Sequence, residues 1–539
     1  MHYDYIIVGG GSAGCILADR LSADGQYSVL LLEAGERDDG FWFRIPVGFA
    51  RLYYNQRFNW MYDSEPQSTL DGRRLYVPRG KVLGGSGAIN AMIYVRGQPR
   101  DFDDWAAAGN PGWSYEDVLP YFRRLETHPS TDDQQHGRTG PIHITPMKNA
   151  VHPIVRHFLQ GCAQAGLPAC DDFNAGAAEG AGIYDINARD GERCSSSRAY
   201  LRPAMQRPNL EVRTRCQVQS ITWDALGCRA NGVVALHGGQ QVRLHAGREV
   251  ILCAGAVDSP RLLQLSGIGD PATLARHGIP LTRAMPAVGR HLQDHLCASF
   301  YYKSTVPTLN DQLGNRWGQL RLGLQYLLRR SGPLSMSVNQ AGGFFRGTAT
   351  ATHPNLQLYF NPLSYQIPRD GGTLKPEPYP GFLLCFNPCR PTSRGEIRLA
   401  SADPSQPALI DPNYLSTDHD VDEVLQGCRL IRRLMDTPAL RAINAREVLP
   451  GVETRTDEQM LDYFRANCGS IYHLSGSCAM GPDPATSVVD ARLRVHGLQG
   501  LRVVDASIFP NVTSGNTQAA TFMVAEKGAD MILADARNG

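Results

Sequence analysis

The sequence that decides the fold lies near the start of the chain: Tyr5-Ile6-Ile7-Val8-Gly9-Gly10-Gly11-Ser12-Ala13-Gly14. Its first four residues are an apolar run that is typical of a buried strand. Three glycines end this run, and a helical pattern of apolar residues continues to Leu21. A second apolar run, residues 27–33, predicts another buried strand. Strand, glycine turn, helix and strand form a βαβ unit, which predicts a parallel sheet.

Residues 9–14 fit the G-x-G-x-x-G pattern of dinucleotide-binding turns. Gly9 makes the tight turn, Gly11 lets the backbone approach a pyrophosphate, and Gly14 lets the helix pack close to the sheet. Glu33 ends the next strand, where a carboxylate can bind ribose hydroxyls. The pattern does not choose between FAD and a nicotinamide nucleotide. The residues that it assigns to a dinucleotide are Gly9, Gly11, Ser12, Ala13, Gly14 and Glu33.

The same turn contains a G-x-S-x-G pattern, which in α/β-hydrolases presents a nucleophilic serine. The oxyanion loop of those enzymes precedes the serine, whereas the similar segment here, residues 237–239, follows it. The serine would also lie after the first strand rather than deep in the sheet. We therefore interpret the turn as a nucleotide site.

Composition narrows the class of protein. The 539 residues are 42% hydrophobic and 19% charged, so the chain can bury a large core. Its 53 basic and 52 acidic residues give a net charge of +1, which argues against a nucleic-acid partner. The 13 cysteines show no zinc spacing, so we expect reduced thiols and no metal site. No signal peptide or transmembrane segment is recognisable, and we expect a cytoplasmic protein that is open to peripheral membrane contact.

Four longer motifs give the chain a family resemblance. They are Pro78–Met92 (PRGKVLGGSGAINAM), Gly255–Gly269, Val288–His295 (VGRHLQDH) and Val504–Pro510 (VDASIFP). In this order they resemble the glucose–methanol–choline (GMC) oxidoreductases, in the branch of bacterial alcohol and choline dehydrogenases. The resemblance covers nearly the whole chain. It implies FAD, with the flavin between a Rossmann-like FAD-binding domain and a substrate-binding domain.

The resemblance also assigns residues to the cofactor. Gly84 and Gly85 can place bare backbone N–H groups beside a phosphate or the flavin edge, with a tight packing turn as the alternative role. Ile89 stands where some choline-type oxidases carry a flavin-linking histidine. An aliphatic side chain cannot form that bond, so we expect non-covalent FAD. The further cofactor residues that the resemblance implies are Arg79, Asn90, Ala91, Met92, Val218, Asp505, Ala506, Asn516 and Thr517.

Two residues occupy the family's catalytic positions, His473 and Asn516. A neutral imidazole can take the proton of an alcohol at physiological pH. Asn516 offers a donor and an acceptor that do not titrate, and it precedes a helix expected over residues 517–536. The dipole of that helix would stabilise a reduced, anionic flavin. The departures from the family's block around the histidine are Leu474, Ser477 and Ala479.

The substrate side is predicted from three residues. Relatives that oxidise choline carry a carboxylate a few residues before a G-x-F element, and Gln340 takes that place here. A neutral amide does not offset a quaternary ammonium, so we expect uncharged alcohols to be preferred over choline. Tyr359 and Asn361 lie in an apolar strand and are expected to line the pocket, with a plain core strand as the alternative.

The expected fold is α/β with two discontinuous domains. We assign residues 1–150, 205–300 and 465–539 to the FAD-binding domain. Residues 151–204 and 301–464 are assigned to the substrate-binding domain, built on an antiparallel sheet flanked by helices.

The expected activity is oxidation of a primary alcohol to the aldehyde, with hydride transfer to flavin N5 and His473 as general base. The expected electron acceptor is a quinone or another carrier. Three alternatives stay open. An oxidase would reduce oxygen, and a flavin-bearing hydroxynitrile lyase would use the same base without net redox change. A nucleotide-binding protein without activity would not need the pair of His473 and Asn516.

Overall fold

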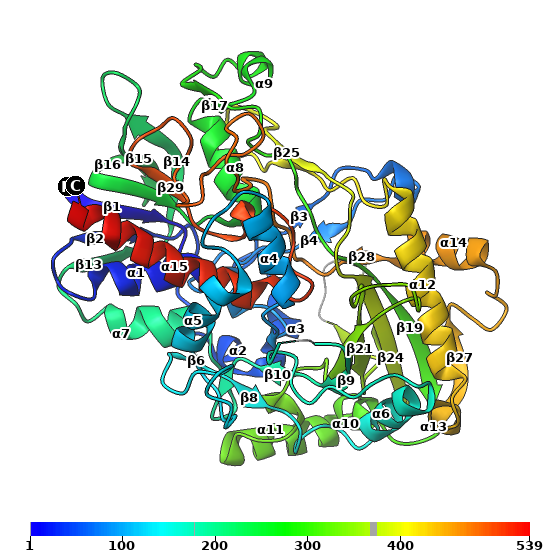
Figure 1. Ribbon diagram of the computed structural model, residues 1–539. Helices are drawn as coiled ribbons and strands as arrows, with labels where there is room; N and C mark the ends of the chain where they lie inside the picture. Colours follow the sequence, from blue (N-terminus) through cyan, green and yellow to red (C-terminus); the bar gives the residue numbers. More distant parts are fainter. Residues whose placement is uncertain (1, 177, 367–373, 539) are drawn as a thin grey trace.

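The computed structural model describes residues 2–176, 178–366 and 374–538, and within them the chain forms two large β-sheets (Figure 1). The first sheet has the strand order β13-β2-β1-β16-β15-β14, with β29 paired to β16. Its strands are β1 (His2–Val8), β2 (Val29–Leu32), β13 (Leu210–Arg213), β14 (Cys216–Trp223), β15 (Ala230–His237), β16 (Gln240–Leu252) and β29 (Leu501–Val503).

The first sheet is parallel around β1, as the βαβ pattern predicts. β1 pairs in parallel with β2 on one side and β16 on the other, and β13 and β29 continue the parallel part. Residues 5–8 are all buried, which explains why this run is continuously apolar rather than alternating. β14, β15 and the first half of β16 form an antiparallel extension. The predicted α/β fold class is confirmed.

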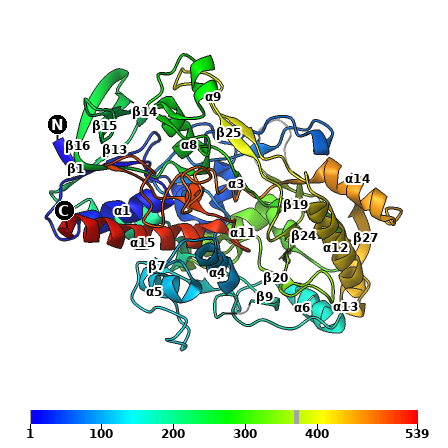
Figure 2. The ribbon, with the colours of Figure 1, turned by 45° about the horizontal axis from the view of Figure 1, so that its top comes forward.

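Helix α1 (Ser12–Ser22) and the C-terminal helix α15 (Thr517–Asn538) pack against each other beside this sheet (Figure 2). The fully buried carboxylate of Glu526 in α15 accepts a hydrogen bond from Arg20 of α1 at 2.7 Å. This packing brings the start of α15 beside the glycine turn, although the two segments lie at opposite ends of the sequence.

The second sheet is antiparallel, with the strand order β20-β21-β24-β19-β27 and with β28 paired to β19. Helix α12 (Asp418–Met435) packs against β24, and α6 (Val155–Gln164) packs against α13 (Pro438–Ile443). The strands are β19 (Leu296–Ser304), β20 (Ala341–Phe345), β21 (Leu356–Asn361), β24 (Gly381–Pro388), β27 (Asn444–Leu449) and β28 (Gly469–Ser470).

The second sheet extends past two of the expected domain boundaries. β19 begins four residues before the expected boundary at 300, and β28 lies beyond the one at 465. Both strands directly adjoin family motifs. No change in amino-acid composition therefore marks the point at which the chain passes from one sheet to the other. As a result, His295 stands immediately before β19 and His473 stands shortly after β28. One pair of strands therefore positions both histidines.

Candidate active site

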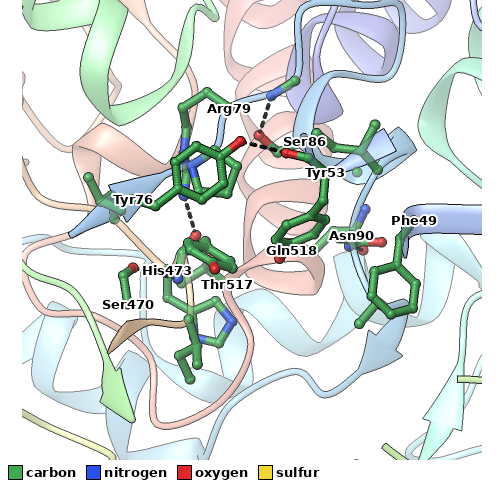
Figure 3. Close-up of a pocket in the computed structure, with 18 of the residues that line it drawn as sticks. Phe49, Tyr53, Tyr76, Arg79, Ser86, Asn90, Ser470, His473, Thr517 and Gln518 are labelled. Atoms are coloured by element: carbon green, nitrogen blue, oxygen red, sulfur yellow. Dashed lines mark hydrogen bonds between the residues drawn. The ribbon is translucent and has the colours of Figure 1, made fainter. Parts of the chain in front are cut away.

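A cavity of about 920 Å³ is lined by residues of both sheets. At one end it meets the glycine turn and Glu33, and at the other it meets strands β21 and β24 of the second sheet. Figure 3 shows His473, Thr517, Gln518 and Asn90 around the part between these ends. A cavity of this size has room for a cofactor together with a small substrate.

The turn after β1 is shaped for the close approach of a ligand. Gly9 has a φ of 106°. A Cβ atom added to Gly14 would lie 1.9 Å from the carbonyl oxygen of Gly9, which is the close packing that the sequence predicts for Gly14. At Gly11, by contrast, the nearest atom would be 3.8 Å away, because this residue borders the cavity. No side chain caps α1, so its first N–H groups are open to an anion.

Gly84 and Gly85 serve close packing, not the donation of bare N–H groups. The N–H of Gly84 binds the carbonyl of Gly10 at 2.7 Å, and that of Gly85 binds Val82 at 2.8 Å. A Cβ atom on Gly85 would lie 2.7 Å from Cα of Gly11. This corrects the expectation that both N–H groups face a ligand. Gly14 and Gly84 stand behind the cavity wall, whereas the lining includes Ser12, Ala13, Gly85, Ala91, Met92, Val218, Ala506 and Thr517.

Two carboxylates border the nucleotide end of the cavity. Glu33 accepts hydrogen bonds from the backbone N–H groups of Gly10 (2.8 Å) and Gly35 (2.7 Å). Burial raises the pKa of Glu33 to about 7. Asp505 accepts from the N–H of Gly255 at 2.8 Å. Each oxygen of Glu33 keeps a second lone pair, which can accept a hydrogen bond from a ribose hydroxyl, whereas Oδ2 of Asp505 also accepts from the Ser259 hydroxyl at 2.6 Å.

Two polar side chains of the cavity wall, Arg79 and Gln518, each keep one buried nitrogen without a partner among the described residues. Asn90 donates to Oε1 of Gln518 at 2.7 Å, and Arg79 donates to the carbonyl of Tyr472 at 2.6 Å. Nε2 of Gln518 and Nε of Arg79 are buried and have no hydrogen-bond partner among the described residues. Buried donors are normally paired, so these two are available to a bound ligand.

His473 and Asn516 face each other across this wall. Nδ2 of Asn516 lies 3.2 Å from Nε2 of His473. The backbone N–H of His473 binds Asp294 at 2.7 Å, and Oδ1 of Asn516 accepts from Nε2 of Gln357 at 3.3 Å. Both residues line the cavity. The structure therefore brings together the two residues that the resemblance assigns to catalysis.

A second histidine fixes which nitrogen of His473 carries its proton. Nε2 of His295 lies 2.7 Å from the carbonyl oxygen of Cys389, which can only accept, so this nitrogen carries the hydrogen. Nδ1 of His295 is then an acceptor, and it lies 2.8 Å from Nδ1 of His473. His473 therefore donates from Nδ1. Its Nε2 therefore carries no hydrogen, and in this structure it accepts a hydrogen bond from Nδ2 of Asn516.

Both imidazoles are neutral at physiological pH. Burial lowers the pKa of His295 to about 4. Burial, His295 and Arg79 together hold the pKa of His473 well below its usual value. The positive guanidinium of Arg79 disfavours an imidazolium nearby. His473 is thus held in the form that accepts a proton.

The substrate end of the cavity is lined by phenols, thiols, hydroxyls and amides. Tyr359 and Asn361 line it as predicted, and the Tyr359 hydroxyl and Oδ1 of Asn361 are buried without a partner among the described residues. Cys297, Ser299 and Tyr301 alternate along β19 and all border the cavity. Cys297 is the first of these three and lies two residues after His295.

Gln340 does not line the cavity. Its Oε1 accepts a hydrogen bond from the backbone N–H of His152 at 2.7 Å, and its side chain is almost fully buried. Val338 and Asn339 border the cavity instead. This corrects the assignment of Gln340 as a substrate contact, because a pattern before a strand does not show to which side a residue points.

Three residues of this site were not predicted from the sequence. His295 stood in a family block but was not assigned to the catalytic centre. Gln518 follows Asn516 by two residues, and its place at the start of a helix is the signal that could have indicated it. Cys297 could have been found from the period of two along β19, since it shares a face with Ser299 and Tyr301.

Comparisons with known proteins agree with this geometry. Residues 3–297 and 391–525 match the sequence profiles of GMC oxidoreductases. The chain is 42% identical to an oxygen-dependent choline dehydrogenase of Escherichia coli K12, over 99% of this chain and 96% of the relative. The structure is similar to pyridoxine 4-oxidase from Mesorbium loti (32% identity, TM-score 0.88, 98% of each chain). It is also similar to an FAD-dependent oxidoreductase from Chaetomium thermophilum (27% identity, TM-score 0.90, 99% and 100% covered).

The cavity has the features that FAD requires. The uncapped helix start and the open space at Gly11 suit a pyrophosphate, Glu33 suits a ribose, and the unpartnered donors of Gln518 and Arg79 suit a ring with several acceptors. The chain therefore belongs to the GMC oxidoreductase family and is an FAD-dependent oxidoreductase.

Proposed function

We propose that this protein oxidises a primary alcohol to the aldehyde, with His473 as the general base. The observation that carries this proposal is the unprotonated Nε2 of a buried, neutral imidazole that borders the cavity beside Asn516. An alcohol hydroxyl at hydrogen-bond distance from Nε2 donates its proton there as the C–H bond breaks. Bound FAD supplies the acceptor for the hydride. The proton and the hydride together account for the two hydrogens that the alcohol loses.

Asn516 orients the alcohol in this proposal. Its Nδ2 lies within reach of the same oxygen that contacts His473, so it can donate to the developing alkoxide. Gln357 donates a hydrogen bond to Oδ1 of Asn516. This contact fixes the amide of Asn516 with its Nδ2 toward His473. Helix α15 begins at Thr517, which lines the cavity, so the positive end of its dipole favours negative charge there.

The substrate class that we propose is an uncharged primary alcohol. Among the described lining residues from the second sheet and its loops, Glu377 is the only carboxylate, and it is partly exposed and paired with Gln366 at 3.0 Å. The cavity-lining residues of β19, β21 and β24 are neutral and carry thiols, phenols, a hydroxyl and an amide. Most of the free-energy cost of removing a quaternary ammonium from water would remain uncompensated there.

The FAD is proposed to be non-covalent. Ile89 lines the cavity, and its side chain has no atom that can bond to the flavin. Acid denaturation should release free FAD into the supernatant. Flavin that stays with the precipitated polypeptide would contradict this attachment but would leave the proposed reaction intact.

The acceptor of the electrons is proposed to be a quinone or another carrier, with oxygen as the alternative. An anaerobic panel of alcohols, followed through flavin absorbance at 450 nm, tests the reaction itself. Bleaching by primary alcohols is expected. Absence of bleaching with cleavage of a cyanohydrin would instead identify a lyase. Mixing the reduced enzyme with oxygen or with a soluble quinone then separates an oxidase from a dehydrogenase.

A further inference from the structure

Helix α11 (Arg316–Arg329) carries an apolar strip that no part of the described chain covers. Its exposed residues include Trp317, of which 82% is accessible, and Leu328, of which 80% is accessible. The strip consists of Trp317, Leu320, Leu324, Leu327 and Leu328. In Figure 1 the helix lies at the lower edge of the molecule. Exposed apolar residues gathered in this way mark a contact surface rather than chance exposure.

The strip follows the period of an α-helix. At 100° per residue its five members fall within a sector of roughly 100° on one side of α11. The two buried apolar residues of the helix, Leu322 and Tyr326, lie on the opposite side and pack it onto the protein. The exposed strip is therefore a second apolar face, which the fold does not need for its own core.

The charges around the strip are of one sign. Arg316 and Arg321 fall on its two flanks, and Arg329 is exposed at the end of the helix. None of the three has an ion-pair partner within the described part of the chain. Residues 312–330 contain no Asp or Glu, although the whole chain is nearly neutral. A tryptophan, leucines and flanking arginines form the pattern of a helix that lies in the interface of an anionic bilayer.

We propose that α11 docks this protein on a membrane surface that contains anionic lipids. No helix among the described residues is long and apolar enough to span a bilayer, so the proposed contact is peripheral. A second copy of the chain would suit the apolar strip of α11 less well than an anionic bilayer does. A two-fold contact of the strip with itself would bring unpaired arginines together without any carboxylate on α11.

The proposed surface lies near the cavity. Following α11, η5 (Pro333–Ser335) packs against η1 (Pro46–Gly48), which in turn contacts α2 (Phe41–Arg44) and α3 (Phe49–Leu52). The first residue of α3 borders the cavity, and the first two residues of α2 are exposed aromatics. A lipid surface on α11 would thus lie close to one wall of the active site.

Vesicle flotation of the FAD-loaded protein tests this proposal. One set of vesicles is pure phosphatidylcholine, and in the other about a third of the lipid is phosphatidylglycerol. We expect binding to the anionic vesicles that weakens as salt is added. The double substitution Leu320→Glu with Leu324→Glu should lower the partition coefficient about tenfold or more. Arg316→Gln with Arg321→Gln should lower it by about 25-fold on anionic vesicles only.

A matched control replaces exposed leucines elsewhere, Leu226→Glu with Leu281→Glu, which should leave binding unchanged. All variants should keep their flavin content and alcohol oxidation, which shows that they are folded. The proposal is overturned if the wild type does not float with anionic vesicles, or if the Leu320→Glu, Leu324→Glu variant floats equally well. It is also overturned if that variant only converts a dimer to a monomer, since the strip would then be a contact between copies.

Discussion

The Nδ1 atoms of His295 and His473 lie 2.8 Å apart, and this contact determines which nitrogen of His473 is the base. The chain of hydrogen bonds starts at the carbonyl of Cys389 and passes through both rings to Nε2 of His473. Neither ring needs a carboxylate partner to hold this tautomer. His295 is thus a positioning residue, which acts on the reaction only through His473.

His295→Ala should lower the rate of flavin reduction by about 10–100-fold, because His473 loses the acceptor that holds its tautomer. His295→Gln should restore most of the rate, since an amide can donate to Cys389 and accept from His473. Stopped-flow absorbance under anaerobic alcohol measures both. Equal rates for the two variants would show that the imidazole has only a packing role.

The pH dependence of kcat/KM should reflect a base with a low pKa. His473 works deprotonated, so activity falls as the pH drops through its pKa and is constant above it. Burial, His295 and Arg79 hold that pKa well below its usual value of about 6.5. A plateau is therefore expected from about pH 7 upwards. In His295→Ala the acid limb should move to higher pH, because one of the groups that lowers the pKa is gone. A wild-type limb centred above pH 7 would contradict this.

Gly11→Ala should weaken FAD binding by about 10–100-fold. The added methyl group meets no protein atom within 3.8 Å, so the loss would arise from the space that the cofactor occupies. Titration of the apoprotein with FAD, followed by fluorescence quenching, gives the Kd. Gly247→Ala is the matched control, because a methyl group there would be 3.6 Å from the nearest atom but outside the cavity. If both variants bind like the wild type, Gly11 does not border the cofactor.

Cys297→Glu should improve the use of choline relative to 3,3-dimethyl-1-butanol, its uncharged isostere. The substitution places a carboxylate on the cavity face of β19, two residues after His295, where the wild type has a thiol. The ratio of the two kcat/KM values should rise about tenfold or more. Cys297→Ser, which stays neutral, should leave the ratio unchanged. A wild type that already prefers choline would contradict the proposed substrate class, and Glu377→Gln would then show whether that carboxylate provides the site.

The part of the fold that sequence predicts well is the part that rests on local geometry. The parallel core and the nucleotide end of the cavity could be predicted from residues 5–14. The sequence requirements of a strand, a tight turn and a helix N-terminus involve only a few neighbouring residues. Gly14 shows this directly, since its packing partner is Gly9. His473 and Asn516 were assigned from motifs and not from geometry.

The parts that sequence did not predict depend on contacts between distant segments. The role of His295 rests on Cys389 and His473, which are 94 and 178 residues away in the chain. The side chain of Gln340 is turned away from the cavity by a hydrogen bond with His152, 188 residues earlier. No pattern within one segment carries such information. The start of β19, four residues before the expected boundary at 300, has no signal in composition because the strand follows a cofactor motif without an intervening linker.

The most direct test of the central claim is single-turnover flavin reduction by a primary alcohol in His473→Ala that retains its FAD. We expect the rate to fall by about 10²–10⁴-fold while the Kd for FAD is unchanged, because the groups that border the nucleotide end lie elsewhere. Asn516→Ala serves as a partial comparison, since it removes the donor to the alkoxide but leaves the base. Near-normal flavin reduction in His473→Ala would contradict the assignment of His473 as the base.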